Sequence, residues 1–361
     1  MNKLLKTLKI AIIGLTILTS KSEACTRALY VGSDNVVITG RSMDWTEDMN
    51  SDLWVFPRGI KRDGAAGPHS VSWTSKYGSL IVSGYNAASA DGMNEKGLVA
   101  NLLYLTESKY GQPKRNTPVM SISLWAQYVL DNFSNVSEAV SALEKEPFTI
   151  LAPSLPNGSP GQLHLSISDP SGDSAIFEYI DGKLVIHHGK QYPVMTNSPT
   201  FDKQLALNAY WESIGGLNFL PGTNRAADRF ARVSFLLNSI PKKTDTHYID
   251  AVPHQDYQNQ ALASMTGVIR SVSVPLGIST PGQPNIASTL WRTISDQKNK
   301  VYYFDSATSP NIFWTELKDL DFHEKAPIKK LALRGRIFSG NVASLYKEAK
   351  PFTFLPASPG K

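Results

Sequence analysis

Hydrophobic and polar residues alternate in short runs over residues 26–105, and turn-forming residues separate these runs. Such alternation is typical of strands that are buried on one face. Asp91-Gly92 and the segment 94–97 have the composition of hairpin turns, so we expect the chain to reverse at both. The pattern predicts two strands within 71–85 and single strands over 36–39, 53–56 and 98–105.

Apolar residues recur at helical spacing further along the chain. Residues 120–132 follow Pro118 and predict one helix. Ser134 or Asn135 is placed to cap a second helix, which Pro147 ends. The same spacing predicts three later helices, at 200–213, 226–239 and about 255–270.

Further strands are expected between and after these helices. The Pro-, Gly- and Ser-rich segment 149–162 predicts a loop. The predicted strands cover 163–168, 175–179, 183–187 and 192–196, and 289–295 forms a hairpin with 300–305. Strands and helices come in separate runs rather than as alternating βαβ units, which favours an α+β fold with antiparallel sheets. We expect a single domain over residues 25–361.

The first 24 residues have the pattern of a cleavable export signal. Three lysines precede the apolar run 10–18, and small residues, Ser22 and Ala24, stand third and first before Cys25. The apolar run is too short to span a bilayer, which needs about 20 residues. We therefore expect residues 1–24 to be removed and the protein to be periplasmic or secreted.

Composition narrows the class of protein. The formal charge of +5 falls to about +2 without the signal, because that segment holds four lysines and one glutamate (5 − 3). No clustered basic run indicates nucleic-acid binding. The hydrophobic fraction of 42% fits a globular protein with a sizeable core. No segment after residue 24 has the pattern of a membrane span, so we expect no stable membrane insertion. The chain has one cysteine, so no internal disulfide is expected.

That single cysteine, Cys25, would become the first residue after removal of the signal. It would then carry a thiol and a free α-amino group on the same carbon, a nucleophile and a base on one residue. Two other readings stay open from the residues alone. Cys25 is an inert buried side chain, or it is the lipid-bearing residue of a lipoprotein, although Ser22 and Glu23 depart from the usual lipoprotein pattern.

Several polar residues are candidates to act with Cys25. Arg41 and Asp44 follow the first strand pair, where a guanidinium would favour a thiolate and a carboxylate would hold an amine. Asn197 ends a strand, where its amide would stabilise an oxyanion. Arg229 lies on a predicted helix. A surface ion pair, a helix cap and a solvated arginine are the respective alternatives. The seven histidines show no metal-ligand spacing, and no phosphate-binding glycine loop is present.

These pieces together resemble the choloylglycine hydrolase family, which includes bile salt hydrolases and penicillin V acylases. The resemblance runs from Cys25 to about residue 340 and rests on six motifs in the family's order. It implies a four-layer αββα fold of the N-terminal nucleophile type and hydrolysis of a linear amide without a cofactor. The motifs are Cys25-Thr26-Arg27, 40–45, 91–98, 196–199, 228–232 and Trp291-Arg292 through Phe304.

The resemblance also implies roles for residues. Cys25 would be the nucleophile and its amine the base, with Asp44 holding the amine and Arg41 beside the sulfur. Asn197 and the backbone N–H of Tyr104 would form the oxyanion hole, and Arg229 would support the site electrostatically. An apolar acyl group would meet a pocket whose lining we expect to include Met43, Trp45 and Tyr85.

Two departures from the family pattern bear on substrate and assembly. Many bile salt hydrolases carry Asn where Tyr104 stands, and Tyr resembles the penicillin V acylase branch. The segment between Asn197 and Arg229 is shorter than in Gram-positive relatives, where an insertion helps to hold a tetramer, so a homo-oligomer is an open expectation. The candidate substrates are penicillin V, conjugated bile salts and acyl-homoserine lactones. The rival reading is a non-catalytic exported binding protein or a lipoprotein anchored through Cys25.

Overall fold

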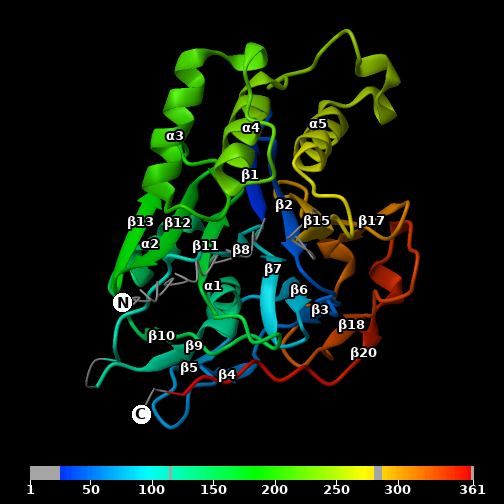
Figure 1. The fold of residues 1–361 in the computed structure, drawn as a ribbon. Coiled ribbons are helices and arrows are strands. Elements are labelled where there is room, and N and C mark those ends of the chain that lie inside the picture. The colour runs from blue at the N-terminus through cyan, green and yellow to red at the C-terminus, as the bar shows by residue number, and fades with distance from the viewer. Residues whose placement is uncertain (1–24, 114–115, 280–286, 359–361) are drawn as a thin grey trace, which may run out of the picture.

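The structure is a computed structural model that describes residues 25–113, 116–279 and 287–358. The expected export signal, residues 1–24, lies outside the described residues. Two large sheets face each other in the centre of the molecule, and helices cover the outer face of each (Figure 1). The layers therefore follow the order helix, sheet, sheet, helix.

One central sheet contains the strand that begins beside Cys25. Adjacent strands of this sheet are antiparallel, except for the last pair, β17 and β19, which is parallel. In spatial order its seven strands are β14 (Val194–Met195), β1 (Thr26–Val31), β2 (Val37–Trp45), β15 (Ser288–Asp296), β16 (Val301–Ser306), β17 (Ile312–Glu316) and β19 (Gly340–Asn341).

The second central sheet is antiparallel throughout. In spatial order its nine strands are β13 (Lys183–His188), β12 (Ser174–Ile180), β11 (Leu163–Ser168), β8 (Val99–Tyr104), β7 (Ala88–Asn94), β6 (Ser79–Gly84), β3 (Leu53–Phe56), β18 (Lys329–Leu331) and β20 (Lys347–Glu348). Two small pairs stand apart, β4 (Lys61–Asp63) with β5 (Ser72–Thr74) and β9 (Val119–Ser121) with β10 (Thr149–Leu151).

The helices divide between the two outer faces. The helices α4 (Ala226–Ser239) and α5 (Tyr257–Ser271) pack on β1 and β2, and α3 (Phe201–Ile214) packs on α4. On the other sheet, α1 (Trp125–Asn132) packs on β7 and β8, and α2 (Val136–Leu143) packs on β12. Single 3₁₀ turns are η1 (Ile122–Leu124), η2 (Gly216–Asn218), η3 (Ile249–Ala251), η4 (Pro253–Gln255), η5 (Leu317–Asp319) and η6 (Ala343–Leu345).

Two hydrophobic clusters explain this layering. One includes inward residues of both sheets together with α4 and α5, and Cys25 belongs to it. The other lies between the nine-stranded sheet and α1 and α2. Each sheet is thus buried on both faces, which accounts for central strands such as β2 and β8 being buried along their whole length. No helix in the described part of the chain is long and apolar enough to cross a membrane.

The expected helices and most expected strands are present, with three differences. The loop expected over 149–162 begins only after β10, because Thr149–Leu151 pairs with β9. Asp91-Gly92 was expected to be a turn, and that expectation is wrong because both residues lie inside β7. A side chain at position 92 would meet Ile81 Cγ2 at 2.6 Å and the Leu80 carbonyl at 2.7 Å, so glycine is required there for strand packing. The helix expected from residue 120 begins only at Trp125, because β9 pairs with β10 and a 3₁₀ turn follows it.

Candidate active site

Strand register places Cys25 between the two sheets. Thr26 faces Ser42 and Arg27 faces Arg41 across the β1–β2 pair, so Cys25 is level with Met43. The cysteine is 2% exposed, and its sulfur lies 3.8 Å from Met43 Sδ and 3.7 Å from the Asp44 carbonyl oxygen. The chain's only thiol is therefore enclosed by β2, the strand on which the sequence predicted its partners.

Arg41 reaches the sulfur of Cys25 from the next strand. Its Nη2 donates to the Leu102 carbonyl at 2.9 Å and lies 3.9 Å from Cys25 Sγ. The guanidinium also lies over the ring of Trp291, 4.6 Å from the ring centroid. Arg41 is fully buried, so its charge acts on the thiol through a medium that screens little.

Asp44 is buried on the same strand and is held by hydroxyl groups. Its Oδ1 accepts from Thr289 of β15, and its Oδ2 accepts from Ser42 at 3.3 Å. Burial raises the pKa of Asp44 to about 6, against the opposing effects of Arg229 and the Thr289 hydrogen bond. The described hydrogen bond of the Cys25 nitrogen goes to Asn197 rather than to this carboxylate. The amine-holding role expected for Asp44 stays a prediction.

Arg229 connects the start of β1 to Asn197. Its Nη1 donates to the Cys25 carbonyl at 2.5 Å and to the hydroxyl of Thr26, and its Nη2 donates to Asn197 Oδ1 at 2.9 Å. The Cys25 nitrogen donates to the same Oδ1 at 2.6 Å, and Asn197 Nδ2 donates to the Tyr104 carbonyl at 2.7 Å. Because an arginine can only donate, it fixes which end of the Asn197 amide faces Cys25.

Further buried hydrogen bonds fix the segment that carries Asn197. The carbonyl of Thr196 accepts from His164 Nε2 at 2.8 Å, and His164 Nδ1 lies 3.0 Å from Glu178 Oε1. Glu178 also accepts from the backbone N–H of Phe201, where α3 begins. These buried contacts come from β11 and β12, and the pattern of the chain did not indicate that these two strands meet residue 197. The sequence therefore gave no signal for them.

Burial raises the pKa of the Cys25 thiol above its ordinary value. Arg41 opposes that effect most strongly, Asp44 adds to it, and Arg229 opposes it. The thiol therefore stands between two cations and one carboxyl group, an arrangement in which small changes in charge alter its protonation.

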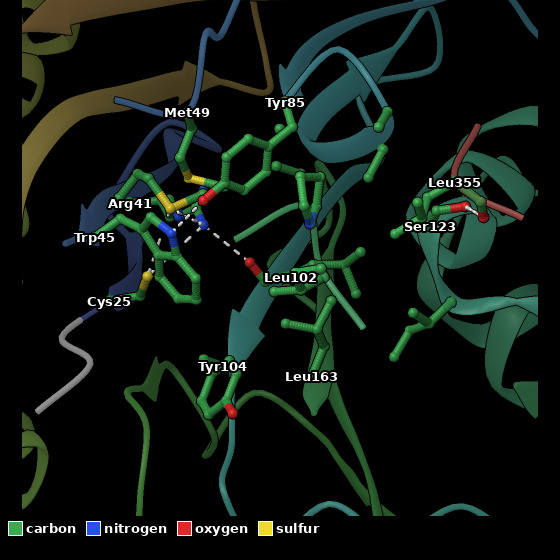
Figure 2. A pocket seen from close by; sticks show the side chains of 18 residues that line it. Cys25, Arg41, Trp45, Met49, Tyr85, Leu102, Tyr104, Ser123, Leu163 and Leu355 are labelled. Atoms are coloured by element: carbon green, nitrogen blue, oxygen red, sulfur yellow. Dashed lines mark hydrogen bonds between the residues drawn. The ribbon is translucent and has the colours of Figure 1, made fainter. Parts of the chain in front are cut away.

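An apolar cavity opens beside the sulfur (Figure 2). Cys25, Arg41 and Trp45 lie on one side of it, and Leu102, Tyr104 and Leu163 from β8 and β11 lie across from them. Trp45 Nε1 donates to the Tyr85 hydroxyl at 2.7 Å, and the rings of Trp45 and Tyr104 are 5.8 Å apart. Further lining residues are Met43, Met49, Gly84, Ala87, Ala88, Ala90, Ile122, Ser123, Leu155, Pro156 and Leu355.

The structure thus brings the sequence-predicted residues together. Six of them line the cavity, and the other three contact Cys25 or influence its charge. The six are Cys25, Arg41, Met43, Trp45, Tyr85 and Tyr104, and the three are Asp44, Asn197 and Arg229. Their catalytic and binding roles stay predictions. In the described ranges, no three His, Cys, Asp or Glu side chains group as metal ligands.

Comparison with known proteins identifies the family. Residues 25–330 match the model of linear amide C–N hydrolases of the choloylglycine hydrolase family. The chain is 48% identical to a penicillin V acylase of Pectobacterium atrosepticum over an alignment of 359 positions, and this alignment covers 96% of each chain. It is 33% identical over 280 residues to a bile salt hydrolase/transferase of Clostridium perfringens, covering 69% of this chain and 82% of that one.

Solved structures agree with this result. The structure of a penicillin V acylase from Agrobacterium tumefaciens is 56% identical, with a TM-score of 0.83 over 92% of this chain and 100% of that one. A mutant conjugated bile acid hydrolase from Clostridium perfringens shares the fold at 22% identity, with a TM-score of 0.70 over 87% of this chain and 98% of that one. The expected α+β, αββα fold of the N-terminal nucleophile type is confirmed. The chain belongs to the choloylglycine hydrolase family and is an amidohydrolase that acts on linear amides.

Proposed function

We propose that this protein is an exported acylase of the penicillin V acylase type in which Cys25, exposed by removal of residues 1–24, is the nucleophile. One observation carries the proposal. The single cysteine of the chain lies at an apolar cavity, with its nitrogen on Asn197, its carbonyl oxygen on Arg229 and its sulfur near Arg41. A merely structural cysteine needs none of these polar contacts.

In the proposed reaction the Cys25 sulfur attacks the amide carbonyl carbon as a thiolate, after passing its proton to the α-amine. The tetrahedral oxyanion accepts hydrogen bonds from the Tyr104 N–H and from the Asn197 Nδ2 hydrogen that does not bind the Tyr104 carbonyl. Collapse breaks the C–N bond, and the leaving nitrogen takes the proton from the α-ammonium. A water, deprotonated by the α-amine, then attacks the thioester and releases the acid and the free thiol.

The lining of the cavity suits the acyl half of the substrate. Aliphatic and aromatic side chains surround it, including Met43, Trp45 and Tyr85. An apolar acyl group such as phenoxyacetyl gains free energy by leaving water there, about 25 cal/mol per Å² of apolar surface. The strongest support for penicillin V is the name of the relatives with 48% and 56% identity. Conjugated bile salts and acyl-homoserine lactones are the other substrates to assay, in parallel.

The deciding experiment replaces Cys25 with serine in the mature protein. We expect Cys25→Ser to keep the wild-type circular dichroism and thermal transition and to lose at least about 10³-fold in turnover of penicillin V, because the hydroxyl is far less ionised than the thiol. Intact mass of active wild-type protein should correspond to a chain that begins at Cys25. Substantial turnover by the serine variant would refute the proposal, as would active protein with residues still ahead of Cys25.

The lipoprotein reading conflicts with the position of Cys25. A cysteine that carries an acylated glycerol must reach the membrane surface, whereas this side chain is 2% exposed between two sheets. Export without a lipid anchor therefore fits the structure better. A diacylglyceryl adduct in the same intact-mass measurement would reverse this preference.

A further inference from the structure

A second buried carboxylate lies behind the proposed nucleophile. Asp91 belongs to β7 of the nine-stranded sheet and is fully buried. Its Oδ2 lies 3.7 Å from Arg41 Nη1 and accepts from Asn101 at 2.6 Å and from Thr293 at 3.3 Å. Its Oδ1 accepts from the hydroxyl of Tyr302. Donors from both sheets thus converge on a carboxylate that the reaction above does not use.

The guanidinium of Arg41 is shared between this carboxylate and the sulfur of Cys25. Nη1 forms the ion pair with Asp91, while Nη2 lies 3.5 Å from Met43 Sδ and 3.9 Å from Cys25 Sγ. Neither Nη1 nor Nε has a hydrogen-bond partner, although both are buried. The bond from Nη2 to the Leu102 carbonyl and the ring of Trp291 hold the guanidinium beside the sulfur, and Asp91 is its charge partner.

We propose that Asp91 is a positioning residue for the reaction: its carboxylate pairs with the guanidinium that Leu102 and Trp291 hold beside the Cys25 sulfur, and it thereby offsets part of the positive charge that acts on the sulfur. This inference rests on the proposed role of Cys25. Without Asp91, a full positive charge would stand beside the sulfur in a medium of low dielectric constant. The thiol would then ionise at lower pH, and its less basic thiolate would be intrinsically less nucleophilic.

The other charges around these groups do not replace Asp91. Asp44 from β2 and Arg229 from α4 also influence the Cys25 thiol, and the α-amine would do so after removal of residues 1–24. Asp91 itself is faced by Arg41 from β2 and by the hydroxyl of Tyr302 from β16. Burial raises the pKa of Asp91, and Arg41 is the largest influence in the opposite direction. Arg41 therefore favours the charged form of Asp91.

The test titrates the thiol directly, because the protein has one cysteine. Thiolate absorbance at 240 nm is followed against pH in the mature wild type and in Asp91→Asn, each with its Cys25→Ser counterpart as the blank. We expect the midpoint in Asp91→Asn to fall by about one pH unit, because Arg41, which lies 3.9 Å from the sulfur, would lose its charge partner. A charge within about 4–6 Å shifts a pKa by about 1–3 units. The acid limb of kcat/KM for penicillin V should move in the same direction.

The matched control is Thr293→Val, which removes one hydrogen bond to the same carboxylate and keeps its charge. The midpoint of the thiol titration in Thr293→Val should equal that of the wild type, because losing one hydrogen bond to Asp91 changes no charge near the sulfur. An unchanged or raised midpoint in folded Asp91→Asn would overturn the inference. If that variant does not fold, Asp91→Ser, which keeps a hydroxyl acceptor for Tyr302, takes its place with the same expectation. Failure of the proposed function is distinguishable, since it appears as activity in Cys25→Ser.

Discussion

At the scale of single residues, the candidate site is held by side chains that cross between elements distant in sequence. Arg229 of α4 contacts Cys25, Thr26 and Asn197, and Thr289 of β15 donates to Asp44 of β2. Each polar group near the sulfur thus has a second residue that fixes its orientation. Pre-orientation of this kind avoids reorganisation during a reaction, which is the main source of electrostatic catalysis.

The Thr289 hydrogen bond gives a prediction about pH. Burial raises the pKa of Asp44 to about 6, and the Thr289 hydrogen bond lowers it from what it would otherwise be. In Thr289→Val, which keeps the shape of the side chain, the pKa should rise further. If Asp44 must be ionised to hold the α-amine, the lowest-pH limb of kcat/KM will shift upward, by about half a unit to one unit for the loss of one hydrogen bond.

The effect of Asp44 on stability has the opposite sense to that of an ion-paired carboxylate. The folded chain binds the Asp44 proton more tightly than the unfolded chain, for which the ordinary pKa is 3.8. Its contribution to the free energy of unfolding therefore falls as the pH rises from about 4 through about 6.

The kinetic prediction for Thr289→Val has a clear contrary outcome. A pH–rate profile identical to that of the wild type would show that Asp44 does not control the lowest-pH limb of kcat/KM.

The sequence identified part of this site and missed the rest for a physical reason. Arg41 and Asp44 were predictable because β2 follows β1 directly, so their proximity to Cys25 is a local property of a strand pair. Asp91, Thr289 and His164 reach the site from strands on three other segments. Which strands become neighbours depends on sheet order, and alternation of polar and apolar residues does not encode that order.

At the scale of elements, two glycines differ in what a substitution would do. At one position the packing of neighbouring strands decides the effect on stability, and at the other only helix propensity does. Gly92 faces Ile81 and Ala100 inside β7, with no room for a methyl group. Gly267 lies on the exposed side of α5, where a methyl group would meet nothing within 4 Å. The same substitution should therefore act in opposite directions at the two sites.

We predict that Gly92→Ala lowers the free energy of unfolding by about 1–3 kcal/mol, since the added carbon overlaps the Leu80 carbonyl and Ile81. Gly267→Ala serves as the control and should raise it by about 0.5–1 kcal/mol through helix propensity. Urea unfolding followed by tryptophan fluorescence measures both. A neutral Gly92→Ala would mean that β7 shifts easily to make room.

The elements themselves were largely predictable. The three helices after residue 200 and the hairpin of β15 and β16 match the expected segments closely. For α4 and α5 the reason is a clear apolar periodicity, since each helix buries one face. Asn135 caps α2 through the N–H of Glu138, one of the two caps expected. Asp91-Gly92 misled because a buried ion pair and a tight sheet contact select the same residue types as a turn.

At the scale of the whole molecule, the site lies where the two sheets meet rather than on either one alone. Cys25, Arg41 and Asp44 belong to the seven-stranded side, while Asp91, Leu102 and Tyr104 belong to the nine-stranded side. The fold therefore has to be complete before the site exists. If a residue precedes Cys25, the Cys25 nitrogen is an amide and not an amine. The charge and the hydrogen bonding of that nitrogen in the assembled site then differ.

This arrangement predicts the behaviour of an uncut chain. A protein produced with one alanine retained ahead of Cys25 should fold with the wild-type thermal transition but hydrolyse penicillin V at least about 10²-fold more slowly, because its amide nitrogen cannot act as a general base. Mass spectrometry verifies the extra residue, and initial rates give the comparison. Full activity with that residue still attached would rule out the α-amine as the base.

The hydrogen bonds that Arg229 donates to the Cys25 carbonyl and to the Thr26 hydroxyl have a consequence for maturation. Both of those anchor points lie downstream of the bond that we propose is cut. Trimming the leader would therefore release only what precedes Cys25, and the sulfur would stay where the fold had already put it. Such a protein would become competent in one step, at the moment the peptide bond opens, with no slow rearrangement to follow.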